Sequence, residues 1–202
     1  MKMRRPLQLL ATVLTGAHVR LEPMTAAHFE ALSVVGADPA IWTWYPKPAA
    51  TPAQMREFVD AGLAVQAAGQ GLVFVQIEPQ TGALMGSTRL VLTSAADYRA
   101  EVGWTWLAPR FQRTAVNTES KYLLLRHAFE VLDLLRVEFK TDALNLASRR
   151  ALRRIGAVEE GLWRSHMITA SGRIRDSAYY SITESDWPGV KAGLEQKLSY
   201  KP

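Results

Sequence analysis

The chain has 202 residues, of which 48% are hydrophobic and 21% charged, so it can bury a sizeable core and is not disordered throughout. It contains no cysteine, which excludes disulfides, thiolate metal sites and a cysteine nucleophile. The net charge of +5 suits nucleic acid, an acidic surface or a polyphosphate ligand, and composition does not choose among them.

The first residues have a mixed character. Three of the first five are cationic and precede an apolar stretch over residues 7 to 14, an arrangement that loosely imitates a secretion signal but is short for one. We expect residues 1 to 17 to form an N-terminal extension and residues 18 to 202 a single domain. No apolar run approaches the ~20 residues of a membrane span, so we expect a cytoplasmic protein that does not contact a membrane.

The next part of the chain predicts a strand and two helices. Apolar and charged residues alternate around residues 19 to 21, as in a short strand, and a helix follows over about residues 26 to 35. A second helix begins after Thr51, because Thr51, Pro52 and Gln54 supply a cap, a first-turn proline and a capping-box partner.

Short turns then separate three strands, predicted over residues 72 to 77, 84 to 92 and 98 to 107, which should form an antiparallel meander. The later elements are a helix over residues 118 to 132, a strand over 136 to 141 and a helix over 145 to 155 that Asn145 caps. A hairpin over residues 158 to 182 and a terminal helix over 186 to 198 follow. A meander followed by a strand–helix–strand crossover predicts an α/β (α+β) fold, with a mixed, mostly antiparallel sheet of about seven strands flanked by helices.

The segment from Glu101 to Glu119 is the strongest candidate for chemistry. Its strand leads through a loop to a helix N-terminus, where unpaired N–H groups and a partial positive charge can bind a diphosphate. Arg113 adds a formal charge beside that point. The loop contains no glycine, however, and a plain strand–helix connection is the commoner explanation of this spacing.

Several short motifs, in this order and spacing, resemble the GNAT superfamily of N-acetyltransferases, in particular its RimJ/RimL-like branch, over about residues 18 to 194. They are His18-Val19-Arg20-Leu21-Glu22-Pro23, Glu101-Val102-Gly103-Trp104, Thr118-Glu119, Asn145-Leu146-Ala147-Ser148, Arg154-Ile155-Gly156-Ala157 and Glu160-Gly161. The resemblance implies a GNAT-type fold and direct transfer of an acetyl group from acetyl-CoA to a primary amine, without a metal.

The resemblance also implies where the co-substrate binds. The pantetheine arm should pair with the strand near Trp106 and Leu107 and contact Asn145, and the diphosphate should lie on the loop formed by Gln112, Arg113, Thr114, Ala115, Val116, Asn117 and Thr118. The loop departs from the family pattern at two positions. Ala115 replaces the first glycine, and Asn117, which could also cap the helix, replaces the last small residue.

For catalysis, the resemblance implies Glu101 as the base that deprotonates the amine and Ser148 as a hydroxyl donor to the departing thiolate. A tyrosine that many family members use as the acid is replaced by Leu152. From the residues alone, Glu101 could equally be an exposed strand carboxylate, and Ser148 a helix serine bonded to the preceding turn.

The resemblance further implies that Trp42, Trp44 and Tyr45 wall the acceptor site, although packing of the loop would explain them equally well. His166 could face the same cleft, and His127 is expected to be structural. None of the four histidines lies in a metal-ligand pattern, so no metal site is expected.

Three hypotheses follow. The leading one is an N-acetyltransferase acting on a protein N-terminus, a polyamine, an aminoglycoside or another small amine, in a chain that could form a homodimer. The second is a non-catalytic acyl-CoA-binding regulatory module on the same fold. The third, a basic protein that binds RNA or the ribosome, has no RNA-recognition motif to support it, so nucleic acid is not an expected partner.

Overall fold

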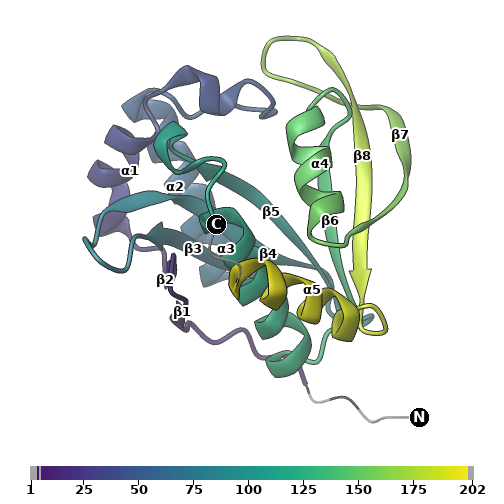
Figure 1. Cartoon of the computed structure of the whole chain (residues 1–202). Helices are drawn as coiled ribbons and strands as arrows, with labels where there is room; N and C mark the ends of the chain where they lie inside the picture. Colours follow the sequence, from purple (N-terminus) through teal and green to yellow (C-terminus); the bar gives the residue numbers. More distant parts are fainter. Residues whose placement is uncertain (1–3, 5, 200–202) are drawn as a thin grey trace.

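The computed structural model describes Arg4 and residues 6 to 199. Its strands form one sheet of eight, in the order β1-β2-β3-β4-β5-β6-β8-β7, with helices on both faces (Figure 1). The elements in chain order are β1 (Leu14–Thr15), β2 (Arg20–Pro23), η1 (Ala26–His28), α1 (Phe29–Val35), η2 (Pro39–Trp42), α2 (Pro52–Ala67), β3 (Gly71–Ile77), β4 (Leu84–Ser94), β5 (Arg99–Leu107), η3 (Pro109–Phe111), α3 (Val116–Arg126), η4 (His127–Val131), β6 (Arg136–Asp142), α4 (Leu146–Arg154), β7 (Val158–Ile168), β8 (Ile174–Thr183) and α5 (Trp187–Ser199).

The predicted mixed sheet flanked by helices is therefore confirmed, with β1 as an eighth strand that the sequence did not predict. Two hydrophobic cores lie on its opposite faces. Helices α3, α4 and α5 cover one core, and α1 and α2 cover the other. Strand β3 contributes to both, because successive side chains alternate between the faces: Phe74 joins the first core, and Val73 and Val75 join the second.

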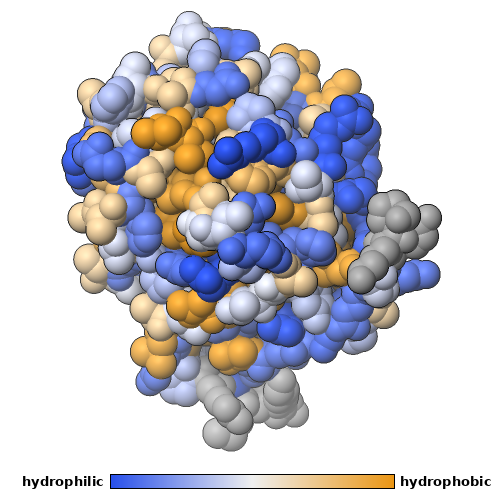
Figure 2. All heavy atoms as spheres, turned by 60° about the vertical axis from the view of Figure 1, so that its left-hand side comes forward, coloured by the Kyte–Doolittle hydropathy of each residue, from blue (hydrophilic) through white to orange (hydrophobic). Residues whose placement is uncertain are grey.

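Hydrophobic side chains also reach the surface. On the side of the molecule that carries α1 and α2 in Figure 1, they gather in a patch surrounded by hydrophilic residues (Figure 2). Among the described residues, no helix is both long and apolar enough to cross a membrane.

Strands β5 and β6 are parallel neighbours that stay together only briefly. Residues Arg99–Glu101 of β5 pair with residues Arg136–Glu138 of β6, and the rest of β5 does not pair with β6. The two ribbons diverge beyond that point, so the sheet opens between them (Figure 1). Because unpaired strand edges present N–H and C=O groups to a ligand, this opening is the natural place for an extended substrate.

Strand β5 also carries a bulge at the opening. Its pairing with β4 passes from Trp106 opposite Ser87 to Gly103 opposite Arg89, so β5 has one extra residue there. Trp104 takes a left-handed backbone conformation, with φ of 53°, which is uncommon for a bulky residue. The bulge sends the side chains of Trp104 and Thr105 to opposite faces, toward Arg89 and Lys121 respectively.

The predicted caps have mixed outcomes. The capping box of α2 is confirmed, because the Gln54 N–H donates to Thr51 Oγ1 at 3.3 Å and the Thr51 N–H donates to Gln54 Oε1 at 3.1 Å. The Asn145 cap of α4 is also confirmed, with the Ser148 N–H donating to Asn145 Oδ1 at 3.0 Å. The Asn117 cap is wrong. Helix α3 begins at Val116 behind Ala115, because Thr114 accepts the first N–H and Asn117 is already helical.

Helix α3 carries a buried carboxylate that fixes the loop between β1 and β2. The Glu119 side chain accepts the backbone N–H groups of Ala17, His18 and Val19 at 2.9, 2.6 and 2.8 Å. The loop passes so close that a Cβ placed on Gly16 would lie 2.3 Å from the carboxyl carbon. Glu119 therefore joins the N-terminal strands to the helix that begins at the candidate diphosphate loop.

We predict that Glu119→Gln lowers the free energy of unfolding by about 1–3 kcal/mol, because the amide presents an N–H₂ group to donors that need an acceptor. Urea unfolding of the variant measures the effect. Glu30→Gln, at an exposed position on α1, is the control and should change the stability by less than about 0.5 kcal/mol. Equal unfolding midpoints for Glu119→Gln and the wild type would contradict this role.

Lys121 on α3 is buried as well, with only 6% of its surface exposed. Its ammonium donates to Thr105 Oγ1 at 2.6 Å, and that hydroxyl lies 2.7 Å from Thr88 Oγ1. Burial lowers the pKa of Lys121 from 10.5 to about 7, since the charged form is poorly solvated there.

This pKa makes stability depend on pH. The unfolded chain, with a lysine pKa of about 10.4, binds more protons than the native state between about pH 7 and pH 10, so the free energy of unfolding should rise with pH in that window. Lys121→Met removes the titrating group. We predict that the free energy of unfolding of Lys121→Met, minus that of the wild type, is highest at pH 6 and lower at pH 9, as measured by urea unfolding at each pH. A difference independent of pH would contradict this account.

Candidate active site

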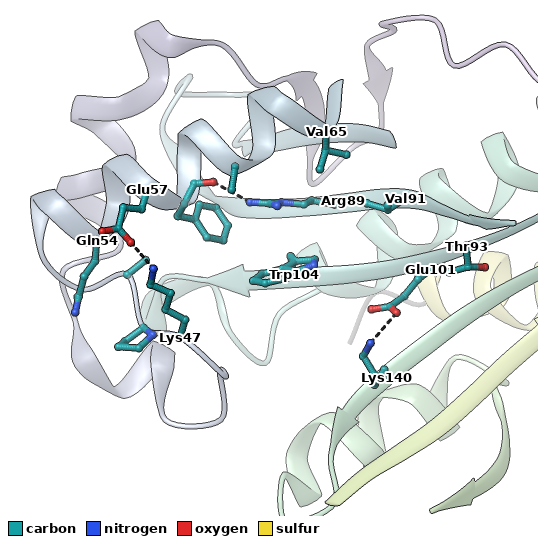
Figure 3. Close-up of a pocket in the computed structure, with 14 residues that line it drawn as sticks. Lys47, Gln54, Glu57, Val65, Arg89, Val91, Thr93, Glu101, Trp104 and Lys140 are labelled. Atoms are coloured by element: carbon teal, nitrogen blue, oxygen red, sulfur yellow. Dashed lines mark hydrogen bonds and ion pairs between the residues drawn. The ribbon is translucent and has the colours of Figure 1, made fainter. Parts of the chain in front are cut away.

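A cavity of about 410 Å³ lies beside the opening between β5 and β6 (Figure 3). Helix α2 forms one wall, and β4, β5, β6 and the loop before α2 form the others. The lining residues are Lys47, Pro48, Ala49, Gln54, Glu57, Phe58, Ala61, Val65, Arg89, Val91, Thr93, Glu101, Trp104 and Lys140. Apolar side chains of α2 thus face charged side chains that come from the sheet.

Glu101 lies where β5 and β6 part, since it is the last β5 residue paired with β6. Its side chain is partly buried, lines the cavity and lies 3.3 Å from Lys140 Nζ (Figure 3). A carboxylate in this position is able to accept a proton from an ammonium group bound in the cavity, either directly or through water.

His166 lies on β7 in an aromatic cluster next to Lys140, and it does not line this cavity. Its Nδ1 is 2.9 Å from Ser177 Oγ, and Trp163 stacks on Tyr179 with ring centroids 4.1 Å apart. Burial lowers the pKa of His166, and the charges of Lys140 and Arg175 lower it further. His166, which was predicted to face the cleft, thus lies two strands beyond Lys140, because β8 separates β7 from β6.

The three aromatic residues predicted to wall the acceptor site have different surroundings. Trp42 is buried in the second core, donates its indole N–H to the Gly36 carbonyl at 2.8 Å and packs 5.2 Å from Trp106. Tyr45 packs 4.9 Å from Trp42, and burial raises the pKa of its hydroxyl. Trp44 lies instead under Arg173, which follows the β7–β8 turn.

Trp42 and Tyr45 also line a second cavity, of about 470 Å³, whose far wall includes Thr169 and Arg173 of the β7–β8 hairpin. This cavity shares Lys47, Pro48 and Gln54 with the first one. Trp42 and Tyr45 therefore separate the core from the second cavity, and neither of them lines the first.

The loop from Gln112 to Thr118 is held by its own side chains. Gln112 Nε2 donates to the Leu107 carbonyl at 2.9 Å, and Thr114 Oγ1 donates to the Phe111 carbonyl at 2.7 Å. Ala115 has φ of −67° and ψ of −19°, an ordinary right-handed conformation, whereas the left-handed residue is Arg113, with φ of 61°. Replacing glycine by Ala115 therefore strains no backbone.

The N-terminus of α3 meets the C-terminal turn of α4. Arg154 Nη2 donates to Thr118 Oγ1 at 2.9 Å, which brings a cation to a helix end that already favours anions. Arg149 and Arg153 point elsewhere, since both pair with Glu159. The first turn of α3 and Arg154 together can hold a diphosphate.

Trp106 and Leu107 end β5, and Asn145 and Ser148 follow β6, so the two predicted groups lie at the ends of the diverging strands. Trp106 is buried, and its carbonyl accepts from Gln76 Nε2 at 3.2 Å. Asn145 caps α4 through the Ser148 N–H. Leu152 is buried in the first core, so it adds no hydrogen-bonding group.

Reasoning from the sequence missed four residues at or beneath the opening: Arg89, Trp104, Lys121 and Lys140. Two of them left a signal. Arg89 is the one charged residue in a predicted strand that is otherwise uncharged, and Lys121 lies three residues before Leu124, on the apolar face of a predicted helix. The position of Trp104 could not be predicted, because the orientation of its side chain depends on the bulge. The position of Lys140 beside Glu101 depends on β6 being the strand next to β5.

Comparisons with known proteins agree with this architecture. A family model described as "Acetyltransferase (GNAT) domain" matches residues 18 to 158. The Bacillus subtilis (strain 168) protein named "Putative ribosomal N-acetyltransferase YdaF" is 34% identical over 110 residues, which span 54% of this chain and 59% of that protein. The chain thus matches only part of the length of that relative.

Solved structures match over nearly the whole chain. A GCN5-related N-acetyltransferase from Brucella melitensis has a TM-score of 0.86 and 29% identity, over 95% of this chain and 87% of its own. Mycobacterium smegmatis RimJ, solved in complex with CoA-disulfide, has a TM-score of 0.78 and 22% identity, over 92% of both chains, and this likeness concerns the fold. With the family model covering well over half of its residues, the chain belongs to the GNAT acetyltransferase family.

Proposed function

We propose that this protein is an N-acetyltransferase that moves the acetyl group of acetyl-CoA directly to a primary amine. The observation that carries the proposal is the opening between β5 and β6, which has Glu101 at its closed end. Membership of the GNAT family supports the same chemistry. A protein N-terminus or a small amine would serve as acceptor, and the ribosomal name of the Bacillus subtilis relative agrees with the first.

Acetyl-CoA would lie along the free edge of β5 toward α3. In this arrangement the pantetheine arm pairs near Trp106 and Leu107. The Leu107 carbonyl accepts one hydrogen bond from Gln112 and has a second lone pair with which it can accept another from the arm. The diphosphate lies on the loop from Gln112 to Thr118, where Arg113 and Arg154 supply positive charge. Asn145 contacts the arm from the β6 side.

The thioester would then lie beside Glu101. Glu101 takes a proton from the ammonium group, and the neutral amine attacks the thioester carbonyl, forming the C–N bond. Backbone N–H groups of the open β5 edge stabilise the negative charge that develops on the carbonyl oxygen. As the C–S bond breaks, the nitrogen, which became cationic on attack, releases its second proton to solvent and leaves a neutral amide. The departing thiolate takes a proton from the Ser148 hydroxyl, which recovers one from solvent.

A second candidate is a regulatory module that binds acyl-CoA without turnover. The observation in its favour is Leu152, which is buried with 7% of its surface exposed and provides no acid where many relatives have a tyrosine. Binding of acetyl-CoA is common to both candidates, so turnover decides between them.

We predict that acetyl-CoA raises the melting temperature, because a ligand that binds only the native state stabilises it by mass action. Ala115→Asp should abolish most of this shift, since a carboxylate at the start of α3 would repel the diphosphate. The same carboxylate suits a helix N-terminus, so the melting temperature of the unliganded variant should not fall. Differential scanning calorimetry with millimolar acetyl-CoA measures both quantities. An undiminished shift in the variant would remove the loop as the diphosphate site.

We predict that Glu101→Gln lowers kcat/KM for amine acetylation by about 100-fold or more, in line with the loss of a general base, and changes acetyl-CoA affinity little. Release of CoA thiol measures turnover, and calorimetric titration measures affinity. Glu138→Gln is the matched control, because Glu138 pairs directly opposite Glu101 on β6 but does not line the cavity. Equal losses in the two variants, or none in Glu101→Gln at any pH, would rule out Glu101 as the base.

A further inference from the structure

Arg89 is a buried cation in the wall of the cavity beside Glu101. Only 3% of its surface is exposed. Its Nη2 donates to the Phe58 carbonyl at 2.9 Å, and its Nε is buried without any partner. A guanidinium has five N–H donors, and a buried donor without an acceptor is energetically unfavourable, so this guanidinium has donor capacity left for an acceptor from outside the chain.

The other charges of the cavity do not supply that acceptor. Glu57 pairs with Lys47, and Glu101 pairs with Lys140 at 3.3 Å (Figure 3). Among the described residues that line the cavity, Arg89 is the one cation with no ion pair to a carboxylate. Burial lowers the pKa of Arg89 to about 10, with the nearby Tyr45 opposing the shift, so the guanidinium stays charged at neutral pH.

Two aromatic rings hold the guanidinium in place. Its carbon lies 4.5 Å from the centre of the Phe58 ring and 5.0 Å from that of Trp104. Such contacts stabilise the faces of a guanidinium and leave its N–H edge available. Trp104 reaches Arg89 from the bulge, in a left-handed conformation that is unfavourable for a bulky residue and persists only where its surroundings enforce it.

We propose that the acceptor carries a carboxylate that binds Arg89 while its amine lies at Glu101. The proposal rests on the proposed acetyl transfer. Arg89 pairs opposite Gly103, and Glu101 is two residues away on β5. The two residues are therefore diagonal neighbours about 7–8 Å apart, on different strands. We therefore expect a spacer between the carboxylate and the amine that is longer than the single carbon of an α-amino acid.

The same cavity disfavours polycations. A polyamine or an aminoglycoside would place its additional ammonium groups next to Arg89, and like charges in a poorly hydrated site repel strongly. The apolar wall formed by Phe58, Ala61 and Val65 instead suits an uncharged spacer. The predicted substrate class is thus an amine with an apolar spacer and a carboxylate, in a small molecule or in the N-terminal segment of a peptide.

Pairs of acceptors that differ only in the carboxylate test the predicted preference for a carboxylate on the wild-type protein. The first pair is 6-aminohexanoate and hexylamine, and glycine is included as an amine whose carboxylate is too close. The second pair is a short peptide with aspartate at its third position and the same peptide with asparagine. We expect the carboxylate to raise kcat/KM by about tenfold or more in at least one pair, the value for one charge-assisted hydrogen bond or more, and the pair that responds identifies the source.

Variants connect the preference to Arg89. In Arg89→Met the ratio within the responding pair should fall to about one, whereas Arg89→Lys should retain part of it, because a single charge remains. Arg56→Met is the matched control, since Arg56 also stacks on a ring, that of Phe29, but does not line the cavity. An acetyl-CoA-induced rise in melting temperature verifies that each variant is folded.

A binding measurement separates failure of this proposal from failure of the proposed function. Calorimetric titration with 6-acetamidohexanoate in the presence of CoA reports the carboxylate site without turnover, and its affinity should fall about tenfold or more in Arg89→Met. Binding that depends on Arg89 without acetylation of any amine would overturn acetyl transfer and leave a carboxylate site. Acetylation with equal kcat/KM within both pairs would overturn the carboxylate site and leave acetyl transfer.

Discussion

The short parallel pairing of β5 with β6 is the constraint on which the rest of the site depends. Only the first three residues of β5 pair with β6, and the two strands then separate. Had the pairing continued, the backbone groups from Gly103 to Leu107 would be used within the sheet. Because it stops at Glu101, the protein keeps an open strand edge inside an otherwise continuous sheet, with a carboxylate at its closed end.

The elements around the opening follow from this divergence. The C-terminal ends of β5 and β6 lead to α3 and α4, and the two helices meet where Arg154 bonds to Thr118. On the opposite face, α2 and the bulge in β5 enclose the cavity that contains Arg89. In the proposed function, one face of the opening would bind the diphosphate, and the other would bind the acceptor.

Buried charge is the second recurring feature. Glu119 uses three backbone N–H groups in place of a cation, and Lys121 has one hydroxyl as its partner. Arg89 has two aromatic rings and a carbonyl. Burying a charge without an ion pair is unfavourable unless other groups solvate it, and these contacts provide that solvation. Arg89 alone of the three lines the cavity.

Much of the fold could be predicted from the sequence, because local signals specify its elements. The capping box at Thr51 and the cap at Asn145 gave the starts of α2 and α4, and turn residues separated the strands of the meander. Asn117 was a wrong prediction, since a good cap residue does not have to be the cap when the preceding loop supplies Thr114 instead.

The site was less predictable, because its geometry depends on contacts between distant segments. Glu101 was predicted from the resemblance, but the pairing of Lys140 with it requires β6 to lie beside β5. Arg89 faces the cavity only because α2 covers that face of β4. A charge within an apolar strand, such as Arg89, is a signal that sequence reasoning could use.

The measurement that tests the central claim most directly is product analysis by mass spectrometry after incubation with acetyl-CoA and a panel of amines. Direct transfer predicts N-acetylated amine and free CoA in equal amounts with the wild type, and little of either with Glu101→Gln. Tight binding of acetyl-CoA with no acetylated amine from any acceptor, or release of CoA without an acetylated product, would contradict direct transfer to an amine.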